Sequence, residues 1–365
     1  MFDRQIWAAV PFHFWSIVFF VLGAIVGSLL NVCIHRMPRG ESIIFPPSHC
    51  PHCQYSIPWY LNIPLVTWVY LRGRCANCAA PISVRYFLVE LLTAVAFLGA
   101  WLEYGHQSPA LALIYCLLLA GFIVATFIDF EHFIIPDEIT IGGIIVGLAL
   151  SSMVPELHGV AQRAAGLRQS LLGALAGAGI IYAILRLGKL LFGRQRFVLE
   201  PGTRVIFTEH ALLLPGQEIP YEEIFYRKSD AIELQAQHVE LIDRCYAQAP
   251  VRLTPRALEI AGDTFDPESI PQFDVITDQV VIPREAMGLG DVKFMGALGA
   301  FLGWQAVLFS LMVSAVLGSA VGVLLIAVHK RAWSSRIPYG PYIALAATLW
   351  VFGGKRLVAW WWSGM

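Results

Sequence analysis

The chain has 365 residues, of which 57% are hydrophobic and only 14% are charged, and its formal net charge is -1. The mean hydropathy is +0.64. A soluble fold cannot bury that much apolar surface, so the composition excludes a soluble globular protein and predicts a membrane protein. The sequence shows no basic aromatic patch, and we therefore expect no nucleic-acid partner.

Long apolar segments recur along the chain. A helix that crosses about 30 Å of hydrocarbon needs about 20 residues. Apolar segments near or below that length lie close to residues 14–34, 85–102, 108–128, 139–154, 169–192, 290–304, 305–329 and 340–354. We therefore predict an all-α polytopic membrane protein with about eight transmembrane helices.

The first apolar segment sets the predicted orientation. It continues as GSLLNVCIHRMPRG, where Arg36 and Arg39 would stop it on the cytoplasmic side, and no small-residue cleavage site follows it. The sequence thus predicts an uncleaved first span, residues 1–34, with the N-terminus outside. The basic residues of 35–85 and 186–293 then lie inside.

Four cysteines mark the next segment, the predicted cytosolic domain 35–84. Cys50, Cys53, Cys75 and Cys78 form two CxxC pairs. Two such pairs can place four thiolates tetrahedrally around one zinc ion, and four protein ligands leave no open coordination position. Disulfides are the alternative, but a reducing cytosol disfavours them. We predict a structural zinc that holds together a loop too small to build its own core.

An aspartate ends one apolar segment, and a second aspartate begins the next, in ATFIDFEHFIIPDEITIGG. An ionisable residue at membrane depth is costly and tends to be functional, which favours Asp129, although a boundary residue wetted by the cytosol fits equally well. Asp137 follows Pro136 and precedes an apolar periodic segment. These are the features of a helix N-cap or first-turn residue, and a structural capping role is the favoured interpretation for Asp137.

A third aspartate follows a glycine-rich turn, GLGDVK. Gly288 and Gly290 allow a tight turn or a close backbone approach before the next helix. The predicted topology places Asp291 on the same face as Asp129. Lys293 can lower the pKa of Asp291 or bind an anionic group, and a lysine that snorkels at the boundary is the alternative.

A pair of neighbouring carboxylates can carry out peptide hydrolysis. Both cannot easily ionise, so one holds a proton while the other acts as a base toward water. Such a pair needs no covalent intermediate. The sequence contains no nucleophile elbow and no HExxH motif, so serine and zinc proteolysis lack support.

Residues 193–287 differ in composition from the rest and are predicted to form a β-rich cytosolic insert. FTEHALLLPGQEIPYEEI at 207–224 aligns with LTPRALEIAGDTFDPESI at 253–270, and each copy predicts two short strands around a glycine turn. Binding of another protein and inert packing are both open for this insert. The predicted organisation is then 1–34, 35–84, 85–192, 193–287 and 288–365.

Taken together, these motifs resemble the type IV prepilin leader peptidases, the bifunctional processing enzymes of bacterial type IV pili and type II secretion. The resemblance is carried by GSLLNVCIHRMP at 27–38, the cysteine box with NIPLVTW, CAAPISVRYFLVELLTA at 78–94, the segment 129–137, and GLGDVKFMGALGAFLGW at 288–304. The insert departs from the short connection that the family has in its place.

The resemblance implies an eight-span GxGD aspartic endopeptidase of the bacterial inner membrane, whose catalytic aspartates align with Asp129 and Asp291. Its substrates would be prepilins or pseudopilins, cleaved at the cytoplasmic face and then N-methylated with S-adenosylmethionine. The cysteine-box form of the family is the one associated with methylation, but no residue here is assigned to the cofactor. The implied partners are these substrates, the lipid bilayer, and pilus or secretion assembly components.

Two other classes of protein remain as alternatives. A GxGD protease of the presenilin or signal-peptide-peptidase type should show a YD pair where this chain has FIDFEHF. A non-catalytic membrane assembly scaffold would use the zinc loop for docking and keep its aspartates as solvated boundary residues. A transporter is disfavoured because the spans carry no mid-span charges for a relay.

Overall fold

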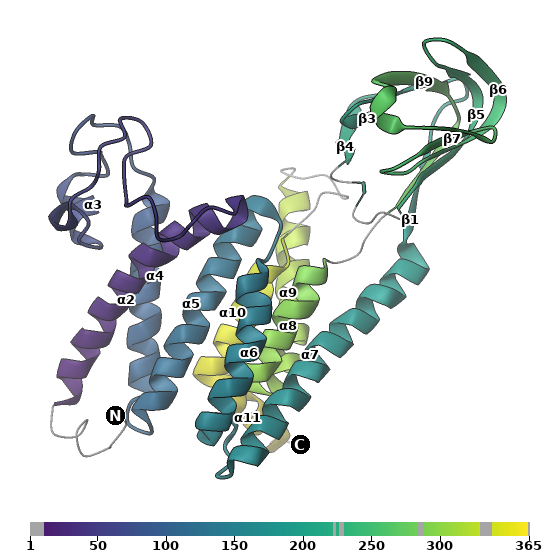
Figure 1. The fold of residues 1–365 in the computed structure, drawn as a ribbon. Helices are drawn as coiled ribbons and strands as arrows, with labels where there is room; N and C mark the ends of the chain where they lie inside the picture. Colours follow the sequence, from purple (N-terminus) through teal and green to yellow (C-terminus); the bar gives the residue numbers. More distant parts are fainter. Residues whose placement is uncertain (1–10, 222–223, 226–229, 284–287, 329–337, 364–365) are drawn as a thin grey trace. The chain divides into compact units, whose positions relative to one another are not determined.

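A computed structural model describes residues 11–221, 224–225, 230–283, 288–328 and 338–363. The chain forms two compact units, Met1–Ile181 with Leu289–Met365, and Tyr182–Gly288 (Figure 1). Residues 1–10, 222–223, 226–229, 284–287, 329–337 and 364–365 lie outside the described residues. They belong to the predicted first span, the insert and the last segment.

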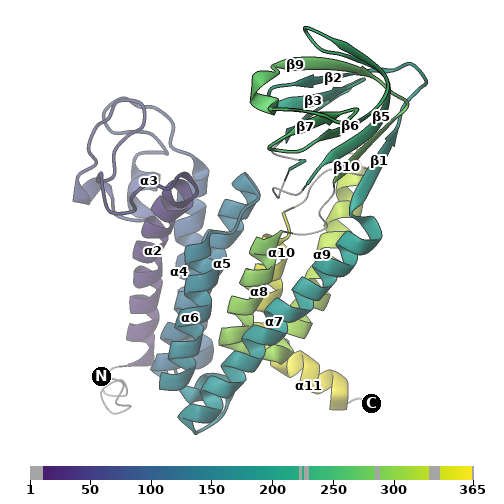
Figure 2. The ribbon, with the colours of Figure 1, turned by 45° about the vertical axis from the view of Figure 1, so that its right-hand side comes forward.

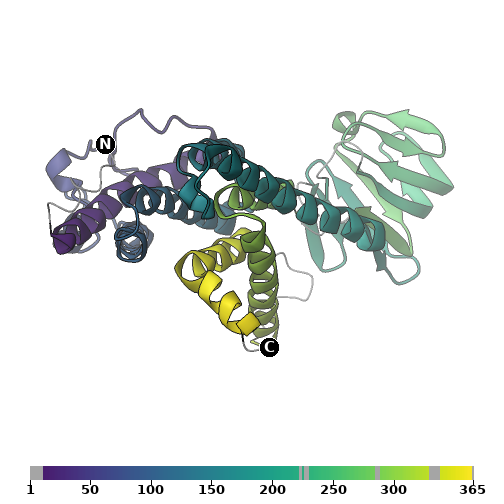
Figure 3. The ribbon, with the colours of Figure 1, turned by 90° about the horizontal axis from the view of Figure 1, so that it is seen from below.

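The first unit is a bundle of helices. They are α2 (Phe12–Arg36), α4 (Val84–Tyr104), α5 (Pro109–His132), α6 (Asp137–Met153), α7 (Arg163–Phe192), α8 (Leu289–Leu302), α9 (Trp304–Ala327), α10 (Gly340–Leu349) and α11 (Lys355–Ser363), with the short α3 (Val66–Tyr70). The part of α7 after Ile181 belongs to the second unit. Helix α2 packs on α4, α4 on α5, α6 on α8, and α10 on both α9 and α5. The view of Figure 3 shows α9 and α10 side by side.

A helix occupies each predicted apolar segment, but the helices differ in length. Among the described residues, five helices are long and apolar enough to cross a membrane, namely α2, α4, α5, α7 and α9. Helices α6, α8 and α10 have 17, 14 and 10 residues. Several apolar helices thus fit a multi-pass membrane protein, and the number of eight spans stays a prediction.

Glycines let α7 and α8 touch through their backbones. A Cβ on Gly173 would lie 2.0 Å from the Gly299 carbonyl oxygen, and a Cβ on Gly177 would lie 2.1 Å from that of Met295. Small residues allow helices without a large apolar driving force to pack closely in a membrane. The Ser170 hydroxyl adds a hydrogen bond to the Ala300 carbonyl at 2.6 Å. These contacts position α8, which begins with the GLGD turn.

We predict that Gly173→Ala lowers the midpoint of thermal unfolding of the purified protein, because the new methyl group would meet the Gly299 carbonyl oxygen. Gly179→Ala on the same helix is the matched control, since nothing lies within 4 Å of its Cβ position. That control removes a helix glycine and is expected to keep or slightly raise the midpoint. Equal midpoints for the two variants would contradict the close packing of α7 on α8.

The second unit is built on antiparallel strands. They are β1 (Arg194–Val198), β2 (Arg204–Thr208), β3 (Ala211–Leu214), β4 (Gln217–Pro220), β5 (Ile232–Glu240), β6 (Cys245–Leu253), β7 (Leu258–Ile260), β8 (Asp263–Phe265), β9 (Gln272–Ile276) and β10 (Gln279–Pro283). The order in the sheet is β4-β3-β2-β9-β5-β6-β7-β8, while β10 pairs with both β1 and β5 (Figure 2). Alternating residues such as Val205, Phe207 and Val275 form its core. The insert region is thus β-rich.

The two aligned segments of the insert form equivalent hairpins. Thr208 Oγ1 donates to the Ala211 carbonyl and accepts from its amide at 2.9 and 3.1 Å. Thr254 Oγ1 makes the same two contacts with Ala257 at 2.9 Å each. The β3–β4 and β7–β8 turns each carry a glycine with positive φ. The repeat in the sequence is therefore also a repeat of local structure.

Candidate catalytic and metal sites

The four cysteines of the loop between α2 and α4 gather at one point. Their sulfur atoms all lie within 4.8 Å of one another. The Cys50 and Cys78 sulfurs are 3.8 Å apart. A tetrahedron of thiolates with 2.3 Å metal bonds has edges of about 3.8 Å, so the cluster fits a four-coordinate metal ion.

Both CxxC pairs are built by the same backbone turn. The Cys50 amide donates to the Tyr55 carbonyl, and the Cys75 amide donates to the Ala80 carbonyl in the same way. The residue after each pair, Gln54 or Ala79, has a positive φ. Two equivalent turns thus point two thiols each at a shared centre. We call these turns, residues 50–54 and 75–79, the knuckles.

One thiol of the cluster is primed for the thiolate form. The Asn77 amide donates to Cys53 Sγ at 3.5 Å. This hydrogen bond, with a second one from the backbone, lowers the pKa of the Cys53 thiol to about 6. Metals bind the thiolate, so the environment of Cys53 favours a ligand.

We predict that Cys53→Ser removes the bound metal, because only three thiolates would remain for a four-coordinate ion. Metal content per chain, measured by elemental mass spectrometry on the purified protein, checks this. Cys245→Ser is the matched control, since Cys245 is an exposed free cysteine of the second unit. An unchanged metal content in Cys53→Ser would show that the cluster is not the metal site.

The Asp129 carboxylate is buried at the end of α5. Asp129 is only 6% exposed to solvent. Its Oδ2 atom accepts a hydrogen bond at 2.8 Å from the backbone amide of Gly340, the first residue of α10. A helix N-terminus offers unpaired amides and a partial positive charge, which suits a carboxylate. Asp129 is therefore held by protein and is not a solvated boundary residue.

Asp291 lies in the first turn of α8 and is half-buried. Burial raises the pKa of Tyr339, a hydrogen bond to Ser314 opposes this, and the negative charge of Asp291 raises it further. Tyr339 directly precedes Gly340, the partner of Asp129. Asp129 thus contacts the start of α10 directly, while Asp291, 162 positions further along the chain, acts on the neighbouring Tyr339 through its charge.

Ile135 packs between Gly290 of the GLGD turn and Gly340 at the start of α10. A Cβ on Gly290 would lie 3.5 Å from the Ile135 Cβ, and a Cβ on Gly340 would lie 3.1 Å from its Cδ1. The glycine of the GLGD turn therefore packs against the segment that follows Asp129, while Gly288 is exposed just before α8. The Gly290 contact with Ile135 is an ordinary van der Waals distance, so the predicted close backbone approach is not seen at this position.

Asp137 and Lys293 form an ion pair between α6 and α8. Lys293 Nζ lies 2.6 Å from Asp137 Oδ1, and both side chains are substantially exposed. Asp137 stands in the first turn of α6, but its side chain makes no capping hydrogen bond, because Pro136 occupies the N-cap position. Asp137 is thus a first-turn residue of α6, one of the two places predicted for it, and its side chain pairs with Lys293 of α8.

Sequence reasoning missed Tyr339 and Gly340. Gly340 contributes a backbone amide to the site of Asp129, and Tyr339 contributes a phenol next to it. Neither residue type stands out in the sequence. The signal that could have found them is PYGP, where Pro338 and Pro341 bracket the pair directly before an apolar segment. Proline in a first helical turn is typical of a helix start, and a helix start is an anion site.

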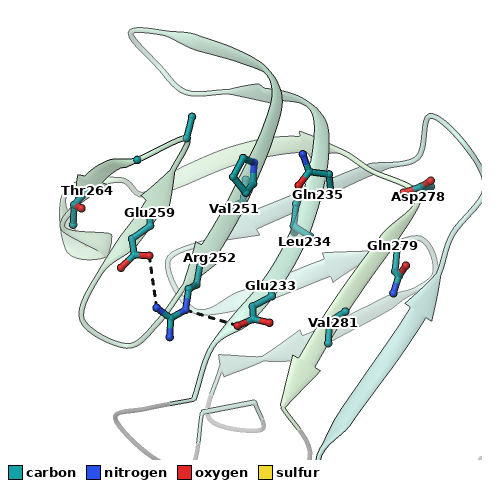
Figure 4. Close-up of a pocket in the computed structure, with 13 residues that line it drawn as sticks. Glu233, Leu234, Gln235, Val251, Arg252, Glu259, Thr264, Asp278, Gln279 and Val281 are labelled. Carbon is teal, nitrogen blue, oxygen red and sulfur yellow. Dashed lines mark ion pairs between the residues drawn. The ribbon is translucent and has the colours of Figure 1, made fainter.

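A cavity lies on the sheet of the second unit (Figure 4). It has a volume of about 550 Å³, and its floor carries Arg252 between Glu233 and Glu259 at 3.8 and 3.7 Å. These side chains are about half exposed, so the ion pairs contribute little stability. The described residues that line the cavity include no histidine, cysteine or serine.

Comparisons with known proteins cover both helical parts of the chain. Residues 21–104 match the model of the bacterial peptidase A24 N-terminal domain. Residues 113–197 and 272–323 match the model of the type IV leader peptidase family. These segments together exceed half of the chain, and they contain the four cysteines of the box, Asp129 and Asp291.

Individual relatives agree with the family models. A prepilin leader peptidase/N-methyltransferase of Aeromonas hydrophila is 27% identical over 380 residues, covering 96% of this chain and 94% of the relative. The protein of that name from Myxococcus xanthus is 43% identical over 150 residues, 40% of this chain and 43% of the relative. A type 4 prepilin-like proteins leader peptide-processing enzyme of Escherichia coli is 45% identical over 144 residues, 34% and 53% of the two chains. No solved structure matches the chain.

Proposed function

Since the chain belongs to the type IV leader peptidase family, we propose that it is a membrane-embedded aspartic endopeptidase that removes the leader peptide from prepilins or pseudopilins. We propose further that it N-methylates the new N-terminal residue, as the names of its relatives state for them. The observation that supports the peptidase is the packing of Ile135, from the segment after Asp129, against both Gly290 of the GLGD turn and Gly340, whose amide donates to Asp129.

In the proposed reaction the two carboxylates divide the proton transfers. One aspartate is ionised and takes a proton from a water molecule as that water attacks the scissile carbonyl carbon. The other is protonated and donates to the carbonyl oxygen. As the carbon–nitrogen bond breaks, the first aspartate passes the proton taken from water to the leaving amine, and the second recovers its proton from the hydroxyl that becomes the product carbonyl. The Gly340 amide stabilises the ionised form of Asp129, while burial opposes that form. We therefore assign the single acidic proton to the two carboxylates together and not to one of them.

The proposed orientation places the site at the cytoplasmic face of the bacterial inner membrane. Helix α2 ends at Arg36 before the cysteine loop, and the end of α5 lies at the same end of the bundle as that loop (Figure 1). Asp129 stands three residues before the last residue of α5, His132. Basic residues such as Arg36, Arg39 and Arg74 gather at that end, which favours the cytoplasmic side. With α6, α8 and α10 as shorter spans, the bundle would have eight.

Zinc is the metal that we propose for the cysteine cluster. The four thiolates of the cluster suit a zinc ion. The ion would join the two knuckles to each other and would take no part in hydrolysis. S-adenosylmethionine is the proposed methyl donor, which supplies an electrophilic methyl group to the new amine. Components of a pilus or secretion assembly are the further proposed partners.

The experiment that tests the peptidase compares Asp129→Asn and Asp291→Asn with the wild type. Each variant is incubated with a prepilin, and mass spectrometry of the prepilin N-terminus measures the rate of leader removal. Loss of an acid or base should lower this rate by about 10²–10⁴-fold in either variant. An added methyl mass on the wild-type product tests the second activity.

Asp137→Asn is the matched control, because it removes a carboxylate at the same end of the bundle but only breaks the ion pair with Lys293. It should cleave at close to the wild-type rate. Wild-type cleavage by Asp129→Asn or Asp291→Asn would refute the assignment. A wild-type protein that is folded, metal-loaded and inactive would favour the assembly scaffold.

We also predict that Gly340→Ala lowers the cleavage rate, because its Cβ would lie 2.8 Å from Asp129 Oδ2 and must push that carboxylate aside. A displacement of about 1 Å in a catalytic group can cost about 10²-fold in rate. Gly142→Ala on α6 has nothing within 4 Å of its Cβ and serves as the control. Equal rates for both variants, measured in the same cleavage assay, would speak against a role for the Gly340 contact.

A further inference from the structure

The loop between α2 and α4 exposes a large set of apolar side chains outside the helical bundle. We call this set the apolar face of the loop. Its members are Ile43, Ile44, Phe45, Trp59, Tyr60, Ile63, Val66, Val69 and Tyr70. Trp59 is 82% exposed and Tyr70 79%. Large exposed apolar side chains gathered in one loop are typical of an interaction site.

The opposite character prevails on and beside the knuckles. The exposed side chains there include polar and charged ones, namely His52, Gln54, Arg72, Arg74 and Asn77. The exposed apolar side chains of the loop therefore come from 43–45 and 59–70, and the exposed polar ones come from on and beside the knuckles. Such segregation is what a segment at a membrane–water boundary needs.

The apolar face continues an apolar stripe on α2. Val21, Ile25 and Leu29 follow each other at helical spacing and are each about half exposed. They lie on a helix long and apolar enough to cross a membrane, where they would face acyl chains. A groove of about 880 Å³ joins the two surfaces, since its lining takes Ile25 and Leu29 from α2 and Ile44, Trp59 and Val66 from the loop.

Two buried charges fix the apolar face in place. The Arg36 guanidinium, at the end of α2, donates to the Ser42 carbonyl at 2.9 Å and to the Pro46 carbonyl at 2.7 Å. The Glu90 carboxylate of α4 accepts from the Leu65 amide at 2.7 Å. These hydrogen bonds hold residues 43–45 and 63–66 against the ends of α2 and α4. They therefore restrict the orientation of the apolar face relative to the two helices.

We propose that the cysteine loop is seated on the bilayer, with its apolar face among the acyl chains of the adjoining leaflet and its knuckles in water. The occupant of the groove is phospholipid. The unbroken surface from the stripe of α2 to the apolar face argues for lipid, as do Trp59, Tyr60 and Tyr70, because Trp and Tyr concentrate at the membrane–water interface. The proposal does not depend on the peptidase activity.

Photocrosslinking in phospholipid nanodiscs tests this proposal on the full chain. Benzoylphenylalanine is introduced singly at Trp59 and at Tyr70, with His52 and Asn77 on the knuckles as matched controls, and an unchanged metal content shows that each variant keeps the loop folded. We expect adducts of phosphatidylcholine at 59 and 70, identified by mass spectrometry, and none at 52 and 77.

Several outcomes would overturn the proposal. Adducts of 59 and 70 to a peptide of a second copy would make the apolar face a contact between chains, and adducts to this chain's own peptides would show that it packs on protein. Equal lipid labelling at 52 and 77 would remove the two-sidedness on which the argument rests. Absence of adducts at all four positions would show that the face is in water.

Discussion

A carboxylate buried at the end of an apolar helix needs a partner, and Asp129 obtains one from the backbone of α10. An unpaired buried charge costs several kcal/mol, so the amide of Gly340 is a condition for keeping this aspartate where it is. The contact in turn requires glycine, because any Cβ at this position would meet the carboxylate. The contact joins the end of α5 to the first residue of α10, directly after Tyr339.

The same principle holds the cysteine loop. A loop of this size has little core of its own, and its backbone needs polar partners at the bundle. Arg36 and Glu90 supply them from the ends of α2 and α4, and each is itself buried by the contact. Buried charges that bond to backbone groups thus connect the helices to the irregular segments, at the aspartates and at the loop alike.

The sequence predicted best what local chemistry decides. The two CxxC pairs predicted a thiol cluster because each pair needs only one tight turn, and the structure gathers the four sulfurs. Apolar segments predicted the helices because length and composition suffice, while α8 and α10 are too short to settle the number of spans from the structure. Asp129 and Asp291 were identified because ionisable residues are rare at such positions.

What depends on tertiary contacts escaped prediction. Gly340 acts through its amide, which no residue pattern reveals, and its partner lies 211 positions away. Asp137 fits a helix cap by sequence, and only the packing of α6 on α8 brings it to Lys293. The segment WYLNIPLVTWVY is visibly apolar, but which of its side chains point outward follows from the hydrogen bonds of Arg36 and Glu90.

The meeting of the two aspartate motifs is tested most directly by a disulfide between Ile135→Cys and Gly290→Cys. The Cβ positions lie 3.5 Å apart, within the range that disulfides span. The account predicts that mild oxidation of the folded protein links these two positions, identified as a joined peptide pair among the native cysteines. A control pair of Ile135→Cys with Gly353→Cys should stay unlinked. No link between 135 and 290, with the metal content of the cysteine cluster unchanged, would contradict the convergence of Asp129 and Asp291.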